Sequence, residues 1–262
     1  AADADGEKKV NLGDRKTATI EVKNPKKWFP DTPNLYMVTL ELKDSTGKVI
    51  EAEAEHVGFR EIYKVNINDA EQEQMQITGQ KIIFRGVNRH DASLENGSAV
   101  TNQEIIDDLK LMKQYNVNAV RTSHYPNAKI LYDLADELGI YVYAEANVES
   151  HYGAYGDHKV PIPGGDSRWV TPVLDRNMNM LELLKNHASI IGWSYGNEAT
   201  YTRCPLDNTY CFWAAAMAVL NRDPSRLRMY ERESDGYYHR YQKDAGADPW
   251  GMETRSKNIV DV

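Results

Sequence analysis

The sequence predicts an antiparallel β-sandwich followed by an incomplete (β/α)8 barrel. Residues 1–80 contain short segments in which apolar and polar side chains alternate, separated by turn residues. From residue 81 onward, apolar strands alternate with amphipathic helices, which is the pattern of a parallel sheet covered by helices. Residues capable of chemistry follow consecutive strands, and in a barrel all such strand ends meet on one face. We therefore expect a sandwich domain over residues 1–80 and the amino-terminal part of a catalytic barrel over residues 81–262.

The composition sets limits on the class of protein. The 262 residues are 41% hydrophobic, which is enough for a substantial core, and the net charge of −8 argues against nucleic acid as a partner. No apolar run approaches the roughly 18 residues of a membrane span, and the first ten residues lack the apolar core of a signal peptide. The cellular compartment stays open. The two cysteines, Cys204 and Cys211, form no disulfide framework, and a local bridge between them stays open.

The amino-terminal region is expected to be a structural platform, because no cluster of catalytic residue types occurs in it. In three segments, apolar and polar side chains alternate as they do in half-buried strands. They are TATIEVK at 17–23, LYMVTLELKD at 35–44 and AEAEHVGFREIYKV at 52–65.

The barrel region is expected to contain about six strands. They are KIIFRGVN (81–88), NAVRTS (118–123), IYVYAEANV (140–148), SIIGWSYGN (189–197), LRMYE (227–231) and NIVDV (258–262). Helices are expected over 101–116, 127–139 and 172–187, and a fourth helix is expected to end at about residue 221. Thr101 and Glu104 form a capping box for the first helix, and Gly139 is a stop signal for the second. A closed barrel of this kind needs about eight strands. The barrel is therefore expected to be open, with the remaining chain or another subunit completing it.

Glu198 is the first catalytic candidate. It follows Asn197 at the end of a fully apolar strand, at the predicted mouth of the barrel. Apolar surroundings disfavour the charged form of a carboxylate, so such a group can hold a proton near neutral pH and donate it as a general acid. Asn197 adds an uncharged hydrogen-bond donor for a substrate hydroxyl. The alternative is that the glutamate only caps a helix or forms a salt bridge.

Further candidates follow the neighbouring strands. Glu149 and His151 come after the third strand and could reach Glu198, and two carboxylates with an imidazole suit Mg²⁺, or alternatively Mn²⁺, better than zinc. An exposed loop is the alternative interpretation of this triplet. His90 and His124 would together form a polar rim suited to sugar hydroxyls, although a lone histidine is more often structural. Arg121 could orient an adjacent carboxylate.

Four motifs occur in an order and at intervals that resemble the beta-galactosidases of glycoside hydrolase family 2. They are FRGVNRHD (84–91), NAVRTSHYPN (118–127), EANVESHYG (145–153) and IIGWSYGNEA (190–199). The resemblance covers nearly the whole chain and implies that the sandwich is immunoglobulin-like. It implies a retaining hydrolase that removes terminal β-D-galactose from β-galactosides such as lactose.

The resemblance also implies roles for individual residues. Glu198 would be the acid/base, and Arg121 would support the site. Asn197, His90 and His124 would contact the galactosyl unit. Magnesium would be held by Glu149, His151 and Glu198, and Na⁺ is kept as a further candidate cation.

The nucleophile is the point at which this sequence departs from the family. A retaining mechanism needs a second carboxylate roughly 5 Å from the acid. The family places it on a later strand, so we expect it beyond Val262, and Glu231 is a weaker candidate within the chain. Trp250 is a candidate sugar-stacking platform. Two alternatives remain, namely a glucuronidase of the same family and a non-catalytic sugar-binding fragment.

Overall fold

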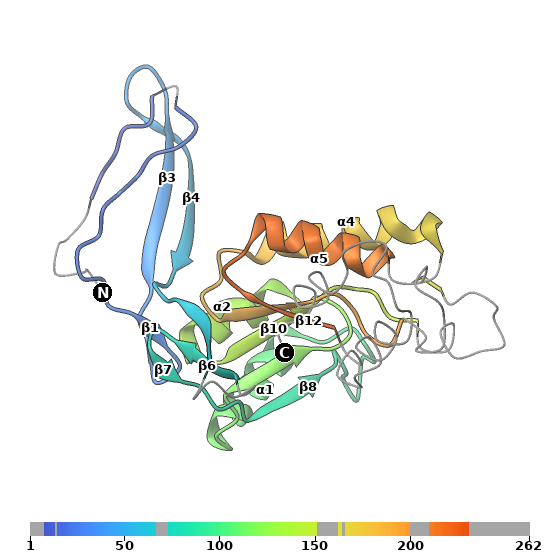
Figure 1. Ribbon diagram of the computed structural model, residues 1–262. Helices are drawn as coiled ribbons and strands as arrows, with labels where there is room; N and C mark the ends of the chain where they lie inside the picture. Colours follow the sequence, from blue (N-terminus) through green and yellow to red (C-terminus); the bar gives the residue numbers. More distant parts are fainter. Residues whose placement is uncertain are drawn as a thin grey trace.

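The computed structural model describes residues 8–13, 15–66, 73–150, 162–163, 166–199 and 210–230 (Figure 1). The amino-terminal strands are β1 (Trp28–Phe29), β2 (Thr32–Pro33), β3 (Tyr36–Lys43), β4 (Val49–Val57), β5 (Ile62–Asn66), β6 (Glu73–Ile77) and β7 (Gln80–Lys81). The later strands are β8 (Gly86–Arg89), β9 (Ala119–Thr122), β10 (Tyr141–Glu145), β11 (Ile190–Ser194) and β12 (Leu227–Met229). The helices are α1 (Asn102–Gln114), α2 (Lys129–Leu138), η1 (Ser167–Trp169), α4 (Val170–Leu184) and α5 (Tyr210–Arg222).

Strands β8 to β12 form one parallel sheet in which each strand pairs with the next strand along the chain. A doubly wound sheet would reverse its order at a switch point, whereas a barrel adds its strands in sequence. The barrel arrangement predicted from the sequence is therefore the one observed. The described residues contain five of these strands. The sixth predicted strand, 258–262, lies outside them, as do Glu231 and Trp250.

The helix signals read from the sequence are confirmed at two positions. Thr101 accepts a hydrogen bond from the backbone of Glu104, and the Glu104 side chain accepts one from the Thr101 backbone, which completes the capping box of α1. Gly139 ends α2 in the left-handed conformation, with φ 69°. Helix α4 begins two residues before the predicted start at 172, directly after the short turn η1.

Two hydrophobic cores lie on opposite faces of the parallel sheet, because side chains alternate along each strand. Val142 and Ala144 of β10 belong to the core formed with the helices. Tyr141 and Tyr143 of the same strand belong to the second core, which also contains Trp28 and Ile77 from the amino-terminal region. The face of the sheet that lines the interior of a barrel is therefore covered, at one end, by residues that precede the barrel in the sequence.

The amino-terminal region forms small antiparallel sheets. Strands β3 and β4 make a long ribbon that projects away from the parallel sheet in Figure 1, and β5, β6 and β7 form a separate sheet. The strand predicted over 17–23 is wrong, since alternation alone does not create a strand without a pairing partner. The strand predicted over 81–88 is divided, because Lys81 belongs to β7 and pairs with Gln76 of β6, whereas the barrel strand begins at Gly86.

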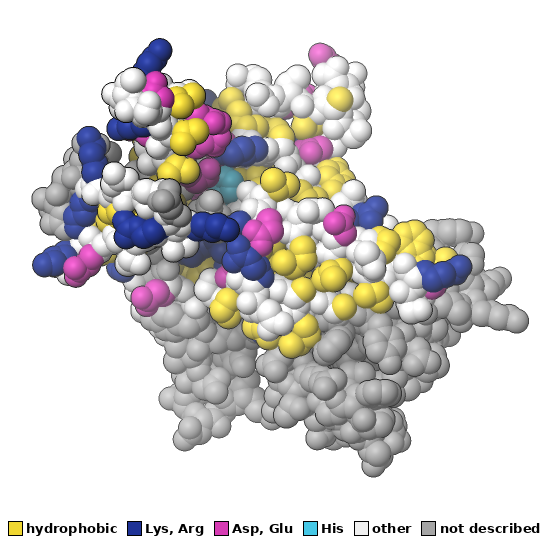
Figure 2. Space-filling view, turned by 90° about the horizontal axis from the view of Figure 1, so that it is seen from above, with side chains coloured by type: hydrophobic (Ala, Val, Ile, Leu, Met, Phe, Trp, Pro, Cys, Tyr) yellow, Lys and Arg dark blue, Asp and Glu magenta, His cyan; other side chains and the backbone are white. Residues whose placement is uncertain are grey.

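The surface mixes charges of both signs. Seen from above, basic and acidic side chains are interspersed with hydrophobic ones (Figure 2). None of the helices in the described part of the chain is long and apolar enough to cross a membrane.

Gly139 also marks a contact between the two regions of the chain. A Cβ atom built there would lie 2.1 Å from the carbonyl oxygen of Pro30, so Gly139→Ala must displace that backbone and also hold alanine at positive φ. We expect the variant to lose more than the roughly 1–2 kcal/mol that the left-handed conformation alone costs. Unfolding in urea measures the loss. Gly97→Ala is the matched control, because Gly97 also has positive φ but no atom lies within 4 Å of its built Cβ. Equal losses for the two variants would contradict this prediction.

Candidate active site

The carboxyl ends of β8 to β11 bring polar side chains together. In the strand register, Asn88 lies opposite Arg121, and Glu145 lies opposite Ser194. Arg121 is two residues beyond Ala119, and Glu145 is two residues beyond Tyr143, so both point to the face occupied by the second core. The polar cluster therefore begins where that apolar core ends.

Glu145 is the centre of this cluster. Its side chain is 0% exposed. Its Oε2 atom accepts hydrogen bonds from Arg121 Nε at 2.5 Å and Ser194 Oγ at 2.6 Å, while Oε1 lies 2.6 Å from His124 Nδ1. The carboxylate thus joins three strand ends. The sequence analysis placed Glu145 at a strand end but gave it no role, although a lone glutamate at the end of the otherwise apolar stretch YVYAE was a signal that could have indicated one.

Arg121 extends the network to the other strands. Its Nη2 atom donates to Asn197 Oδ1 at 2.7 Å, and Nη1 donates to Asn88 Oδ1 at 3.3 Å. The structure therefore places Arg121 in contact with a carboxylate, as the sequence indicated, and that carboxylate is Glu145. Because the guanidinium is a rigid planar fork, it fixes the directions of Glu145 and Asn197 relative to each other.

The two predicted histidines lie side by side. The ring centroids of His90 and His124 are 5.0 Å apart, at an interplanar angle of 77°. An ionised carboxylate only accepts hydrogen bonds, so the contact with Glu145 assigns the hydrogen of His124 to Nδ1. The 3.3 Å approach of Arg121 Nη2 to the same nitrogen joins two donors and is not a hydrogen bond. The Nε2 atom of His124 is the ring nitrogen through which a ligand would be contacted.

A buried arginine supports the loop that carries His90. Arg89 is 5% exposed, and its Nη1 atom donates to Asp91 at 2.5 Å and to Asn127 at 2.8 Å. Its Nε atom donates to Asp108 of α1 at 3.0 Å. These bonds join the loop after β8 to the loop after β9, so they fix the separation of the segments that carry the two histidines.

Asn197 and Glu198 follow β11 in a tightly held segment. The Asn197 backbone donates to Val148 O at 2.9 Å, and its Nδ2 atom donates to Glu149 Oε2 at 2.5 Å. Glu198 is 9% exposed and adopts φ 41°, a conformation that residues other than glycine rarely adopt. Residues held in such conformations cluster at functional sites. Asn197 is therefore fixed between Arg121 and Glu149, and Glu198 is the next residue along the chain.

The predicted metal ligands are described only in part. Glu149 and Glu198 are described, and the hydrogen bond to Asn197 brings Glu149 to the segment that contains Glu198. His151 lies outside the described residues. Within the described ranges, no group of three or more histidine, cysteine or acidic side chains is arranged to hold a metal ion. Glu231, the weaker candidate for the nucleophile, also lies outside these ranges.

Two family models match the chain. The model described as "Glycosyl hydrolases family 2, TIM barrel domain" matches residues 65–249, and the model "Glycosyl hydrolases family 2" matches residues 1–60. Among solved structures, a beta-D-glucuronidase from Dictyoglomus thermophilum is similar with a TM-score of 0.67 and 27% identity, over 80% of this chain and 35% of that one. A beta-galacturonidase from Eisenbergiella tayi is similar with a TM-score of 0.65 and 26% identity, over 82% of this chain and 35% of that one.

Curated relatives carry the name beta-galactosidase. The protein from Priestia megaterium is 39% identical over 90% of this chain, and the protein from Pseudoalteromonas haloplanktis is 43% identical over 81% of it. The chain spans about a fifth of the length of these relatives, since the matches cover 22% and 19% of them. The first family model alone covers more than half of the chain and includes every strand of the parallel sheet. From the sheet, the polar cluster at its carboxyl ends and these matches together, we conclude that the chain belongs to glycosyl hydrolase family 2.

Proposed function

We propose that the protein is a retaining β-galactosidase that removes terminal β-D-galactose from β-galactosides such as lactose, with Glu198 as general acid/base. The observation that carries the proposal is the placement of Glu198 directly after Asn197, which is hydrogen-bonded to Arg121 at the carboxyl ends of the parallel strands. The names of the curated relatives, at about 40% identity, support galactose as the sugar.

The described residues would divide the work as follows. Glu198 would protonate the departing glycosidic oxygen and then deprotonate the attacking water. Asn197 and the two histidines would bind sugar hydroxyls, because amide and imidazole groups can both donate and accept hydrogen bonds. Arg121 would keep Asn197 in place through the 2.7 Å bond to its side-chain oxygen.

The nucleophile has to come from another residue. Glu145 is unsuited to attack a sugar, because its two oxygens already contact Arg121, Ser194 and His124. In line with the family resemblance, the proposal places the nucleophile on a strand later than β12, beyond Val262. It also takes residues 1–80 as an immunoglobulin-like sandwich and residues 81–262 as part of a barrel that the remaining chain or another subunit completes.

Activity assays test this proposal directly. The full-length protein is expected to hydrolyse 4-nitrophenyl β-D-galactoside and to release β-galactose first, which proton NMR detects. Absence of hydrolysis would refute the proposed activity. Release of nitrophenol by the 262-residue chain alone would refute the placement of the nucleophile beyond it.

A glucuronidase of the same family is the second candidate. The similarity to the solved glucuronidase and galacturonidase structures favours it. The two candidates differ at the sugar C6 position, where a uronic acid carries a carboxylate that a cationic side chain would have to bind. Faster hydrolysis of 4-nitrophenyl β-D-glucuronide than of the galactoside would establish the alternative. A non-catalytic sugar-binding fragment would bind galactose without hydrolysing either substrate.

The proposal includes a Mg²⁺ or Mn²⁺ site formed by Glu149, His151 and Glu198. Carboxylate oxygens and one imidazole suit these ions, and the two described carboxylates belong to segments joined by the Asn197 bond. A cation bound there would supply positive charge beside the acid/base residue. Na⁺ is a further candidate for a cation near the sugar.

Removal of one metal ligand gives a specific expectation. In the full-length protein, Glu149→Gln should raise the Mg²⁺ concentration needed for half-maximal activity at least about tenfold, because a neutral amide is a poorer ligand than a carboxylate. Glutamine can still accept the hydrogen bond from Asn197, so the fold of the segment is retained. Titration of Mg²⁺ after EDTA treatment measures the shift. Glu95→Gln, an exposed glutamate in the loop after β8, is the control. An unchanged rate after chelation of the unmodified protein would show that the site is misassigned.

A further inference from the structure

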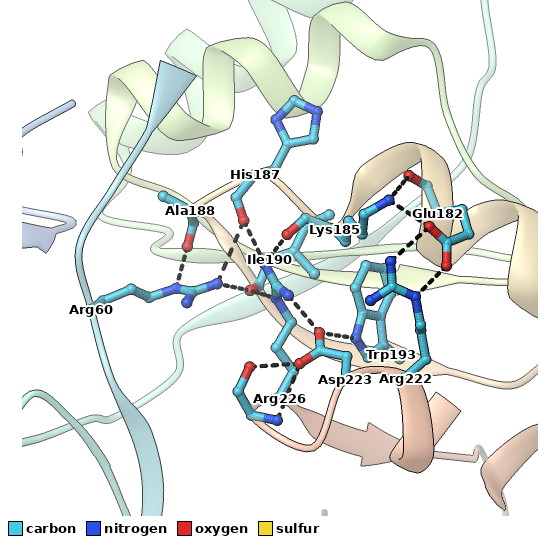
Figure 3. Close-up of polar contacts among 11 residues, drawn as sticks. Arg60, Glu182, Lys185, His187, Ala188, Ile190, Trp193, Arg222, Asp223 and Arg226 are labelled. Carbon is cyan, nitrogen blue, oxygen red and sulfur yellow. Dashed lines mark hydrogen bonds and ion pairs between the residues drawn. The ribbon is translucent and has the colours of Figure 1, made fainter. Parts of the chain in front are cut away.

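Arg60 reaches from the amino-terminal region into the parallel sheet. It lies in the short connection between β4 and β5, and its partly buried side chain extends to the loop between α4 and β11 (Figure 3). There its Nε atom donates to Ala188 O at 2.6 Å, and Nη2 donates to Ile190 O at 2.8 Å. Ile190 is the first residue of β11, so Arg60 binds the amino end of the strand whose other end leads to Asn197 and Glu198.

A second arginine holds the same place from the other side. Arg226 Nε donates to Ile190 O at 2.8 Å, and its Nη2 donates to Lys185 O at 2.6 Å. Its Nη1 atom is paired with Asp223 Oδ2 at 2.5 Å, and Asp223 also accepts from Trp193 Nε1 at 3.0 Å (Figure 3). The Ile190 carbonyl oxygen is thus shared by two guanidinium groups, one from before the barrel and one from within it.

Two positive side chains and one negative side chain lie around this carbonyl. Burial, together with the nearby Arg226, lowers the pKa of Arg60 to about 9, so Arg60 remains charged at pH 7. Burial alone would raise the pKa of Asp223, but Arg226 and the hydrogen bonds that Asp223 accepts lower it to about 2. Asp223 therefore supplies a negative charge beside Arg226, where it also accepts the hydrogen bond from Trp193.

Close packing brings the Arg60 segment to this position. A Cβ atom built on Gly58 would lie 2.6 Å from Ala188 Cβ and 2.9 Å from Trp28 Cβ, so only glycine permits the approach. Trp28 is 0% exposed, and its indole Nε1 donates to Asp136 O of α2 at 2.8 Å. The backbone of Trp28 also donates to Phe59 O at 2.9 Å, beside Arg60. The segment that presents Arg60 is therefore held on the barrel from both sides.

The far end of β11 is equally constrained. Ser194, its last residue, donates to Glu145, and Asn197 binds Arg121 and Glu149. A strand rises by roughly 3.3 Å per residue, so the Ile190 carbonyl lies about 13 Å along the strand from Ser194. Movement of a short, fully buried strand along its axis would carry both ends together. Misplacement of a catalytic group by about 1 Å can cost a factor of about 10² in rate.

We propose that Arg60 is a positioning residue, through which the amino-terminal region fixes the position of β11 along its axis and hence the placement of Asn197 and Glu198. The catalytic part of this inference rests on the proposed function of Glu198. The link from Arg60 to the backbone of β11 does not depend on that function.

Substitutions in the full-length protein test the inference. Arg60→Met keeps an unbranched apolar chain in place of the arginine stem and removes every side-chain donor. Arg60→Lys keeps the charge but loses the fork that reaches two carbonyls. Arg222→Met is the control, because Arg222 is an exposed arginine of α5 that pairs only with Glu182 on the surface among the described contacts. We expect Arg60→Met to lower kcat on the nitrophenyl galactoside about 10-fold to 100-fold with KM changed less than about threefold. Arg60→Lys should recover part of the loss, and Arg222→Met should stay within about twofold.

Hydrogen exchange provides a measurement that does not depend on activity. Backbone amides of Tyr195 and Asn197, just beyond the far end of β11, should exchange faster in Arg60→Met than in the unmodified protein, and at unchanged rates in Arg222→Met. If Arg60→Met only lowers the unfolding midpoint, with kcat and β11 exchange unchanged, Arg60 is merely structural and the inference is wrong. If Arg60→Met does not fold, the same two measurements on Arg60→Lys decide. Faster β11 exchange in a protein that hydrolyses no glycoside would support the link from Arg60 to β11 and refute the proposed activity instead.

Discussion

Replacing Glu198 with glutamine in the full-length protein is expected to lower kcat on an alkyl β-galactoside by about 10²–10⁴-fold, because general acid catalysis contributes factors of this size. Glutamine has nearly the same shape as glutamate but cannot donate a proton to a departing oxygen. Glu198 as a residue is 9% exposed, so bulk water is poorly placed to act as a substitute acid. Steady-state kinetics with a series of galactosides measures the effect.

The dependence on the leaving group identifies the role of Glu198. A dinitrophenolate leaves readily without a proton, whereas an alkoxide does not, so the glycosylation step with a dinitrophenyl galactoside should be much less impaired than that with an alkyl galactoside. Glu137→Gln, an exposed position on α2, is the control and should leave both rates unchanged. Equal impairment of the two substrates would argue against Glu198 as the acid, and retention of activity on the alkyl galactoside would exclude it.

Replacing Glu145 with glutamine is expected to damage both stability and catalysis, even though Glu145 is not expected to touch the substrate. The carboxylate contacts Arg121, Ser194 and His124, all of which present donors to it. A glutamine side chain would direct its own NH₂ group at some of these donors. Breaking a buried charge pair leaves Arg121 without its counter-charge, which costs about 3–5 kcal/mol.

The catalytic effect of this variant should follow from Arg121 and His124. Without the carboxylate, the hydrogen of His124 is no longer fixed on Nδ1, and the hold of Arg121 on Asn197 loosens. We expect kcat/KM to fall by about 10²-fold or more at a temperature where circular dichroism shows the variant folded. Asp133→Asn is the matched control, because it removes a carboxylate from an exposed ion pair with Lys129, which contributes only about 0–1 kcal/mol. Stability and kcat/KM like those of this control would show that Glu145 does not organise the site.

The sequence predicts the parts of the fold that local patterns determine. The capping box at Thr101, the stop at Gly139 and the order of the parallel strands follow from periodicity and from turn and cap chemistry. Periodicity misled at residues 17–23, where alternation is present but no strand partner is described. It also placed residues 81–88 in one strand, although pairing assigns the two ends of that segment to different sheets.

The sequence named several side chains of the polar cluster, but not the hydrogen bonds that connect them. Asn197, Arg121 and His124 are brought together as strand-end reasoning requires. The role of Glu145 was missed because it depends on contacts with residues more than 20 positions away, which no local sequence pattern records. The role of Arg60 was missed for the same reason, since its hydrogen bond to Ala188 joins residues 128 positions apart.

That separation also orders events in time when the protein is synthesised. The carbonyls that Arg60 binds do not exist until residues 188 and 190 have been added, and the Trp28 bond needs residue 136. At about 5–20 residues per second, residue 60 is added to the chain roughly 6 to 26 s before its partners. The ribbon of β3 and β4 is synthesised before residue 60 and before these partners. The amino-terminal region can therefore make its contacts with β11 only after the first four barrel strands have been synthesised. Formation of the Arg60 hydrogen bonds requires that these strands are already present.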